Sequence, residues 1–231
     1  MNLRYVVVGD NHGGEQNDEV VERFFLWISD YRPDIVIHAG DNWNFGCLRK
    51  KATDKEKEQM IAPDFEAGVD FFKRLFHFGK HRHYLRGNHC ERVWETARDS
   101  TNAAIVHAAN RLANDITSLC GKLKVRMLPY DSRLGVLETQ GIRVIHGYVV
   151  GAYAARRLAS IYGTCCYGHT HSMDVGTYEH WPEPYVAYGT GCLLKIDQDY
   201  NSKAIAKLRH SHGWIYGETD GIKATYQQWR V

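Results

Sequence analysis

The sequence predicts an α/β fold in which helices flank mixed β-sheet. Along the first half of the chain, short apolar runs rich in β-branched residues end at glycines, and stretches with helical spacing of apolar residues follow them. After Gly121 the chain is richer in short strand-like runs separated by turns. Strands that alternate with helices favour parallel pairing, whereas successive short strands favour antiparallel pairing, so we expect both kinds.

Length and composition favour one globular domain over residues 1–231. A chain of 231 residues can bury a single sizeable hydrophobic core. Its apolar fraction of 44% and charged fraction of 24% are typical of globular proteins. The formal net charge of +2 neither indicates nor excludes a nucleic-acid partner. The 13 histidines are more informative, because histidine is the commonest metal ligand in proteins.

The N-terminal sequence and the cysteines indicate a cellular compartment. The first residues lack a signal-peptide pattern, and no segment reaches the roughly 20 apolar residues that cross a bilayer. The six cysteines show neither CxxC spacing nor a dense framework, which favours reduced thiols. We therefore expect a soluble cytoplasmic protein without a membrane partner, and the sequence leaves its oligomeric state open.

The pattern of apolar residues locates the individual elements. Strands are predicted at 3–8, 34–39, 83–85, 125–128, 135–139, 143–145 and 164–167, and about three more between 185 and 231. Helices are predicted at 20–31, 65–78 and 152–162, and over 92–119 in two pieces. The charged stretch 49–59 is expected to form a solvated loop or helix face.

Residues that can bind metals follow five of the predicted strands. They occur in the segments Asp10-Asn11-His12, Gly40-Asp41-Asn42, Gly87-Asn88-His89, His146-Gly147 and Gly168-His169-Thr170-His171. Ligands of open α/β sheets gather at the carboxyl ends of strands, so we expect these distant segments to converge. The neighbouring glycines allow tight turns and a close approach of the backbone to an ion.

The donors in these segments are carboxylate, amide oxygen and imidazole. This set suits Mn²⁺, Fe or Zn²⁺ and does not suit a soft metal. Two cations about 3.5–4 Å apart can bind a phosphoryl oxygen, activate a hydroxide and stabilise the leaving oxygen. Cations this close need a bridging carboxylate, for which Asp41 is the natural candidate. We expect two divalent metal ions, with Mn²⁺ favoured and Fe, Zn²⁺ and Ni²⁺ as alternatives.

In combination the five segments resemble the calcineurin-like metallophosphoesterase superfamily. Its pattern is D-x-H, G-D, G-N-H-[DE], H and G-H-x-H, and the resemblance covers residues 9–171. It implies a four-layer sandwich of mixed β-sheets flanked by helices, and metal-dependent hydrolysis of phosphoester bonds. It also implies the metal ligands, which are Asp10, His12 and His171 for one ion, Asn88, His146 and His169 for the other, and Asp41 as the bridge. His89 would contact the phosphate and protonate the leaving oxygen as general acid.

The chain departs from the family pattern at Cys90, where the family usually has Asp or Glu. In the family, that carboxylate is expected to orient the catalytic histidine and to raise its pKa. A thiol is a poor hydrogen-bond acceptor, and Glu91 at a helix start would point elsewhere. We therefore expect His89 to protonate leaving groups weakly, which favours substrates with good leaving groups.

Two branches of the family resemble different parts of the chain. Leu85-Arg86-Gly87-Asn88-His89 is similar to Ser/Thr protein phosphatases, but the arginine that follows their G-D is missing after Asp41. Arg92, the segment 188–192 and the segment His212-Gly213-Trp214 resemble small phosphoesterases encoded by phages and prophages. The second resemblance implies a phage origin, a location in the host cytoplasm, and a nucleic-acid or nucleotide phosphodiester as substrate.

Cations beside aromatic rings are a feature of single-strand binding sites, and the run Arg49-Lys50-Lys51 near Trp43 and Phe45 has this composition. In the alternative interpretation the two rings pack under the metal loop and the cations are solvated. Trp181 could rim a pocket or anchor a turn, and His210 and His212 are expected on the surface. The candidate substrate contacts are Asn88, Arg86, Arg92 and Trp43.

The function predicted from the sequence is that of a phosphodiesterase or nuclease acting on nucleic acid or nucleotides. Two alternatives remain open. One is a phosphomonoesterase, Ser/Thr protein phosphatases included. The other is a non-catalytic binding module that retains its metals, which the complete set of seven ligand positions disfavours.

Overall fold

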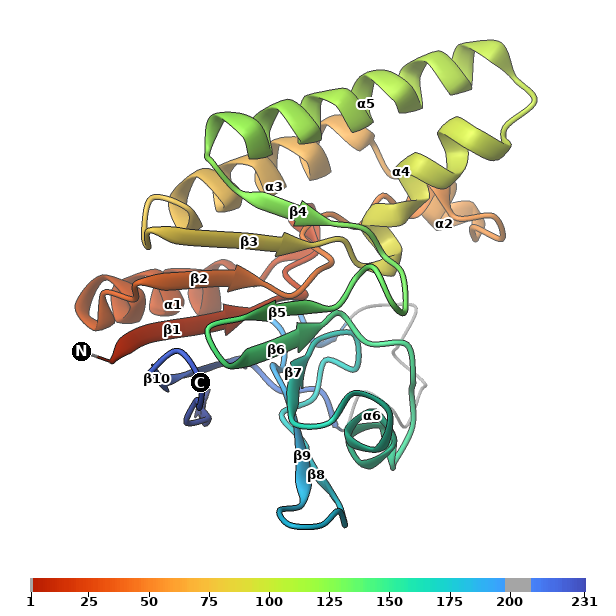
Figure 1. The fold of residues 1–231 in the computed structure, drawn as a ribbon. Coiled ribbons are helices and arrows are strands. Elements are labelled where there is room, and N and C mark those ends of the chain that lie inside the picture. Colours follow the sequence, from red (N-terminus) through yellow and green to blue (C-terminus); the bar gives the residue numbers. More distant parts are fainter. Residues whose placement is uncertain (1, 198–208) are drawn as a thin grey trace.

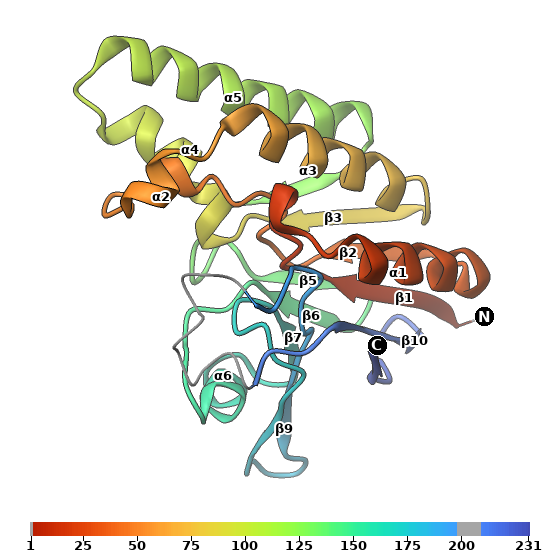
Figure 2. The same ribbon diagram turned by 180° about the vertical axis from the view of Figure 1, so that it is seen from behind.

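The computed structural model describes residues 2–197 and 209–231. Two mixed β-sheets lie against each other, and helices cover their outer faces (Figures 1 and 2). The predicted fold class, a sandwich of mixed sheets flanked by helices, is confirmed. Among the described helices, none is both long and apolar enough to cross a membrane.

The first sheet contains six strands in the order β11-β10-β1-β2-β3-β4. Its strands are β1 (Leu3–Val8), β2 (Ile35–His38), β3 (His81–Leu85), β4 (Arg126–Leu128), β10 (Gly213–Thr219) and β11 (Gln227–Arg230). Strands β1 to β4 are parallel, whereas β10 runs antiparallel to both β1 and β11. The parallel strands therefore end at the same edge of the sheet, where the loops after β1, β2 and β3 meet.

The second sheet has the order β5-β6-β7-β9-β8. Its strands are β5 (Leu137–Thr139), β6 (Ile142–Ile145), β7 (Cys165–Tyr167), β8 (Val175–Tyr178) and β9 (Tyr185–Gly189). The three central strands are parallel, and β5 and β8 pair antiparallel at the two edges. Strand β8 was not predicted, because its four residues include a glycine and lie at an exposed edge.

In the described part of the chain, five longer α-helices and one short α-helix accompany the sheets, besides two 3-10 turns (Gly13–Glu15 and Gly46–Leu48). They are α1 (Asp18–Tyr31), α2 (Asp54–Lys57), α3 (Ile61–Leu75), α4 (Asn88–Asp99), α5 (Ala103–Lys122) and α6 (Ala154–Tyr162). Helix α3 begins four residues before the prediction, because Pro63 lies in its first turn, where a missing N–H costs no hydrogen bond. The predicted break in 92–119 falls at Ser100 to Asn102, and the Asn102 side chain accepts hydrogen bonds from the first amides of α5.

The side chains of β1 point alternately to the two faces of the sheet, and this shows how the layers are built. Val6 and Val8 face the helices and pack with Phe24 of α1 and Phe72 of α3. Val7 and its neighbour Tyr5 belong to a second core, which they share with residues of β5, β6 and β7. A third core lies between α6 and the outer face of the second sheet. The order of the four layers is therefore helices, first sheet, second sheet and helix α6. Each sheet is covered on both faces, because successive side chains of a strand point to opposite faces.

Candidate metal centre

The side chains predicted to bind metals meet at the carboxyl ends of five strands. Those from the first sheet lie after β1 (Asp10 and His12), after β2 (Asp41) and after β3, at the start of α4 (Asn88); those from the second sheet lie after β6 (His146) and β7 (His169 and His171). The histidines and aspartates among them form, together with His89, three groups whose donor atoms lie within 4.8 Å of one another. The convergence expected from the strand ends is present.

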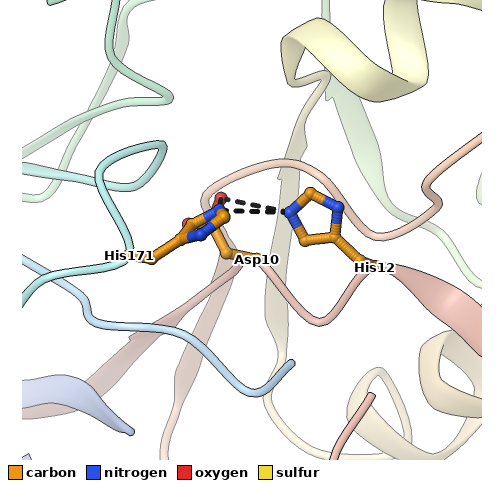
Figure 3. A group of neighbouring side chains, drawn as sticks. All are labelled: Asp10, His12 and His171. Carbon is orange, nitrogen blue, oxygen red and sulfur yellow. Dashed lines mark hydrogen bonds and ion pairs between the residues drawn. The ribbon is translucent and has the colours of Figure 1, made fainter. Parts of the chain in front are cut away.

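Asp10, His12 and His171 form one of these groups (Figure 3). The Nε2 atoms of the two histidines are 3.2 Å apart. The Oδ1 atom of Asp10 lies 3.4 Å from Nε2 of His171 and 3.9 Å from Nε2 of His12. Two ring nitrogens and a carboxylate oxygen therefore face the same point, an arrangement that a cation satisfies.

Asn88, His146 and His169 lie on the other side of Asp41. Oδ1 of Asn88 is 3.1 Å from Nε2 of His146 and 2.8 Å from Nδ1 of His169. Nδ1 of His146 donates a hydrogen bond to the main-chain oxygen of Ala39 at 2.9 Å. This bond fixes the tautomer, so that in the neutral ring the Nε2 lone pair faces the amide and carboxylate oxygens, as in a metal-binding histidine.

The Asp41 carboxylate lies between the two groups. Its Oδ2 atom is 3.2 Å from Nε2 of His146 and 4.0 Å from Nε2 of His12. Its Oδ1 atom accepts a hydrogen bond from the amide of His89 at 2.8 Å. A single carboxylate therefore faces histidines of both groups, the position that a bridging ligand occupies.

The electrostatics of the centre favour bound positive charge. Burial lowers the pKa of His12 and of His169 to about 4, so both rings are neutral and offer lone pairs. Burial also disfavours a charged His146, but the Asp41 and Asp10 carboxylates outweigh it and raise its pKa to about 9. Burial opposes the ionisation of Asp41, yet the nearby histidines, His146 foremost, lower its pKa well below the usual range.

Glycines make room for the side chains of the centre. A Cβ atom at Gly87 would lie 2.1 Å from Oδ1 of Asp41, and one at Gly40 would lie 2.2 Å from Nδ1 of His146. At each of these glycines, a side chain of the centre thus occupies the space that the glycine's own side chain would fill. Five of the predicted ligands also adopt the left-handed backbone conformation that non-glycine residues rarely use: Asp10, His12, Asp41, His169 and His171.

His89 is oriented by Asn44 and not by the residue that follows it. Nδ1 of His89 donates a hydrogen bond to Oδ1 of Asn44 at 2.7 Å. Cys90 is buried below this loop, where its thiol contacts the main chain of Trp43. In this chain position 90 does not orient the histidine, because the Cys90 side chain points into the core.

The structure contradicts one of the predicted substrate contacts, Trp43, and gives another, Arg86, partners within the chain. Trp43 has an exposed fraction of 0% and packs against Phe72, so its ring cannot stack on a substrate base. The alternative interpretation, in which the ring packs under the metal loop, is correct. The Arg86 guanidinium lies 3.2 Å from the Glu91 carboxylate and over the Trp94 ring, and its contact with a substrate stays a prediction.

Arg92 lies at the edge of the centre. Its Nη1 atom donates to the main-chain oxygen of Asn44 at 2.8 Å, beside His89. The cations of the charged stretch have other partners, since Arg49 pairs with Glu56 and Lys50 pairs with Asp99. Among the predicted arginine and tryptophan contacts, Arg92 alone is placed next to the centre.

Sequence reasoning missed Asn44 and His210. Asn44 follows Asp41 by three residues, but no periodicity indicates that it meets His89. The ring of His210 lies 5.0 Å from that of His171, centroid to centroid, although it was expected on the surface far from the last motif. The 39 positions that separate them in the chain give no local signal of this contact.

Comparisons with known proteins identify the family. A sequence model of the calcineurin-like phosphoesterases matches residues 3–173. The chain belongs to this family. It is therefore a member of a family of metal-dependent phosphoester hydrolases, and its clustered histidines and aspartates are candidate ligands for divalent metals.

Several solved structures are similar to the chain. They include a metallophosphoesterase from Sphaerobacter thermophilus (14% identity, 99% of this chain and 88% of that chain, TM-score 0.49). Vps29 from Entamoeba histolytica complexed with Zn²⁺ has 14% identity over 99% of this chain and 98% of that chain (TM-score 0.47). Yfce, a phosphoesterase from E. coli, has 14% identity over 93% and 87% of the two chains (TM-score 0.42). No curated protein sequence matched the chain.

Proposed function

We propose that this chain is a metal-dependent phosphodiesterase that acts on nucleic acid or nucleotides and uses two divalent cations, Mn²⁺ foremost. The observation that carries the proposal is the position of Asp41 between two groups of donors. Asp10, His12 and His171 would hold one ion, and Asn88, His146 and His169 the other. Asp41 would bridge them.

The donor set fits such ions. Next to Asp41, Nε2 of His146 lies 3.1 Å from the amide oxygen of Asn88, and either a proton on this nitrogen or a cation can satisfy both atoms. Buried acceptors that face one another repel unless a proton or a cation lies between them. All the donors are nitrogen or oxygen, which suits Mn²⁺, Fe and Zn²⁺ better than a soft ion.

The residues of the chain would have distinct tasks in hydrolysis. Bound at these donors, divalent cations would supply Lewis-acid chemistry that lowers the pKa of an attacking water and neutralises charge on the phosphoryl group. Asp41 holds the main chain of His89 through its Oδ1 atom, which keeps the ring beside the centre. His89 would contact the phosphate and protonate the leaving oxygen. Its partner Asn44 is neutral, so it supports a charged imidazole less than a carboxylate would.

The charge around the centre favours diesters over monoesters. A monoester phosphate carries up to two negative charges, and its recognition benefits from several convergent cations. Near His89 the chain offers the Arg92 guanidinium, which already donates to the oxygen of Asn44. A diester carries one negative charge and needs less compensation beyond the metal ions.

The direct test compares two chromogenic substrates with Mn²⁺-loaded protein. We expect hydrolysis of bis(p-nitrophenyl) phosphate with a kcat/KM well above that for p-nitrophenyl phosphate. The Asp41→Asn variant is expected to lose turnover and to hold less metal, measured by elemental analysis. Turnover of the monoester alone would favour a phosphomonoesterase. If both substrates resist hydrolysis while two metal ions are bound, a non-catalytic binding module would replace the proposal.

A further inference from the structure

A hollow of about 780 Å³ opens beside the candidate metal centre. Thr170, which lies between His169 and His171, forms part of its wall, and His210 lines it as well. The rings of His171 and His210 are 5.0 Å apart. The hollow therefore lies next to the side of the centre that holds Asp10, His12 and His171.

Two arginines bring positive charge to this hollow. Arg209 precedes β10 and Arg230 ends β11, and both line the hollow. Within residues 2–197 and 209–231, neither guanidinium forms an ion pair. The acidic residue of the wall, Asp174, accepts a hydrogen bond from the Tyr167 hydroxyl. Both arginines lie beyond residue 173, where the match to the family ends.

A smaller hollow of about 270 Å³ lies on the side of Asn44, the partner of His89, and Asn44, Glu15 and Asp64 line it. The two carboxylates on this side are opposed by the Arg92 guanidinium, which donates to the main-chain oxygen of Asn44. The hollow that contains Arg209 and Arg230 therefore attracts a polyanion more strongly than this side does.

The wall of the larger hollow also offers apolar surface. Val150 and Met173 line it together with Ala152. Two guanidiniums can bind one phosphate through paired hydrogen bonds, and the apolar wall can cover a sugar and a base. A volume of this size also exceeds what a lone phosphate needs.

We infer that Arg209 and Arg230 form a subsite for the nucleotide next to the scissile bond of a single-stranded nucleic acid. The phosphate of that nucleotide binds the two guanidiniums, and its sugar and base lie against Val150 and Met173. This inference rests on the proposed function, because it assigns the substrate's flanking nucleotide to a place beside the same centre.

The test measures binding without turnover. Fluorescence anisotropy of a labelled oligothymidylate is followed with chelator-treated protein at several salt concentrations. Replacing both arginines (Arg209→Gln with Arg230→Gln) is expected to weaken binding about tenfold or more. It should also reduce the slope of log K against log salt by about 0.7, since the two arginines bind one phosphate and each neutralised phosphate of a single strand contributes about 0.7. The matched control is Arg111→Gln, an exposed arginine of α5 that pairs with Asp115, and it should bind as the wild type does.

Kinetics with metal-loaded protein give the second readout. We expect the double variant to raise KM for the oligonucleotide at least tenfold more than KM for bis(p-nitrophenyl) phosphate, which has no flanking nucleotide. Three results would overturn the subsite. They are an equal rise in KM for both substrates, unchanged oligothymidylate binding by the double variant, and a weakening of that binding by Arg111→Gln as large as by the double variant. If the two arginines were needed to bind thymidine triphosphate but not the oligonucleotide, the proposal that the subsite takes a nucleotide of a single-stranded nucleic acid would be overturned. If the wild type binds the strand through these arginines but hydrolyses no diester, the proposed function fails and the subsite stands.

Discussion

Asn44 connects the candidate catalytic histidine to the partly buried carboxylate of Glu15. Its Oδ1 atom accepts from Nδ1 of His89, and its Nδ2 atom donates to Oε1 of Glu15 at 2.8 Å. Burial raises the pKa of Glu15, and the carboxylate of Asp64 adds to this effect. An amide has both an acceptor and a donor, so it satisfies both neighbours at once. An ionised aspartate at this position would serve His89 but would repel Glu15.

This geometry predicts the effect of changing the two residues separately and together. Asn44→Asp alone should lower stability by about 1–3 kcal/mol, because a buried donor is lost and two carboxylates meet. Adding Glu15→Gln supplies a new amide donor and should recover most of this loss. The double variant should also hydrolyse diesters of poor leaving groups faster relative to p-nitrophenyl diesters, since a carboxylate then supports a charged His89.

Thermal unfolding and the ratio of kcat/KM for phenyl and p-nitrophenyl diesters measure the two effects. Glu15→Gln alone is the matched control for the loss of the Glu15 charge. An Asn44→Asp variant with wild-type stability and a wild-type ratio of the two kcat/KM values would refute the proposed role of the hydrogen bonds from Asn44 to Glu15 and His89.

Helix α3 supports the loop that carries Asp41. A Cβ atom at Gly68 of this helix would lie 2.0 Å from Nε1 of Trp43. The indole N–H donates to the main-chain oxygen of Phe65 at 3.1 Å, and the Asn42 side chain donates to that of Gly68 at 3.0 Å. The two residues that follow Asp41 are thus bonded to α3. The close approach of helix and ring explains why a glycine occupies the middle of this helix.

Two glycine-to-alanine variants in helices should therefore shift stability in opposite directions. Gly68→Ala gains about 1 kcal/mol of helix propensity, but the clash with Trp43 should outweigh it and destabilise the protein by about 1–3 kcal/mol. Gly121 in α5 has open space around its Cα, so Gly121→Ala should stabilise by about 0.5–1 kcal/mol. Urea unfolding of both variants tests this, and a stabilised Gly68→Ala would contradict the packing argument.

The elements also show how far sequence reasoning reaches. The strands before Asp10, Asp41 and Asn88 could be predicted because a buried strand and the turn after it are local signals. The burial of Trp43 could not, because it depends on Gly68 in a helix 25 positions further along the chain. The role of Asn44 could not either, since its contact with His89 spans 45 positions. Local patterns predicted the ligand positions, whereas the residues around them are set by tertiary packing.

At the scale of the whole molecule, the candidate centre joins the two sheets. Asp10, His12, Asp41 and Asn88 follow strands of the first sheet, and the other three donors (His146, His169 and His171) follow strands of the second. The core between the sheets is apolar, so the polar groups at this edge face one another across the interface. Cations bound there would link the layers as well as serve hydrolysis.

Removing the metal ions should therefore lower the stability of the whole sandwich and not that of one loop. Each ion at a concentration of 100 times its Kd stabilises the folded state by about 2.7 kcal/mol, so two ions contribute about 5.4 kcal/mol. For a chain of this length that corresponds to a rise in Tm of about 11–22 °C. We expect EDTA to lower Tm by this amount in a single cooperative transition, and Mn²⁺ to restore it. Asp41→Asn, which lacks the bridging carboxylate, should respond far less to either addition. Differential scanning calorimetry with metal analysis measures both, and equal responses of the two proteins would show that the ions bind without Asp41.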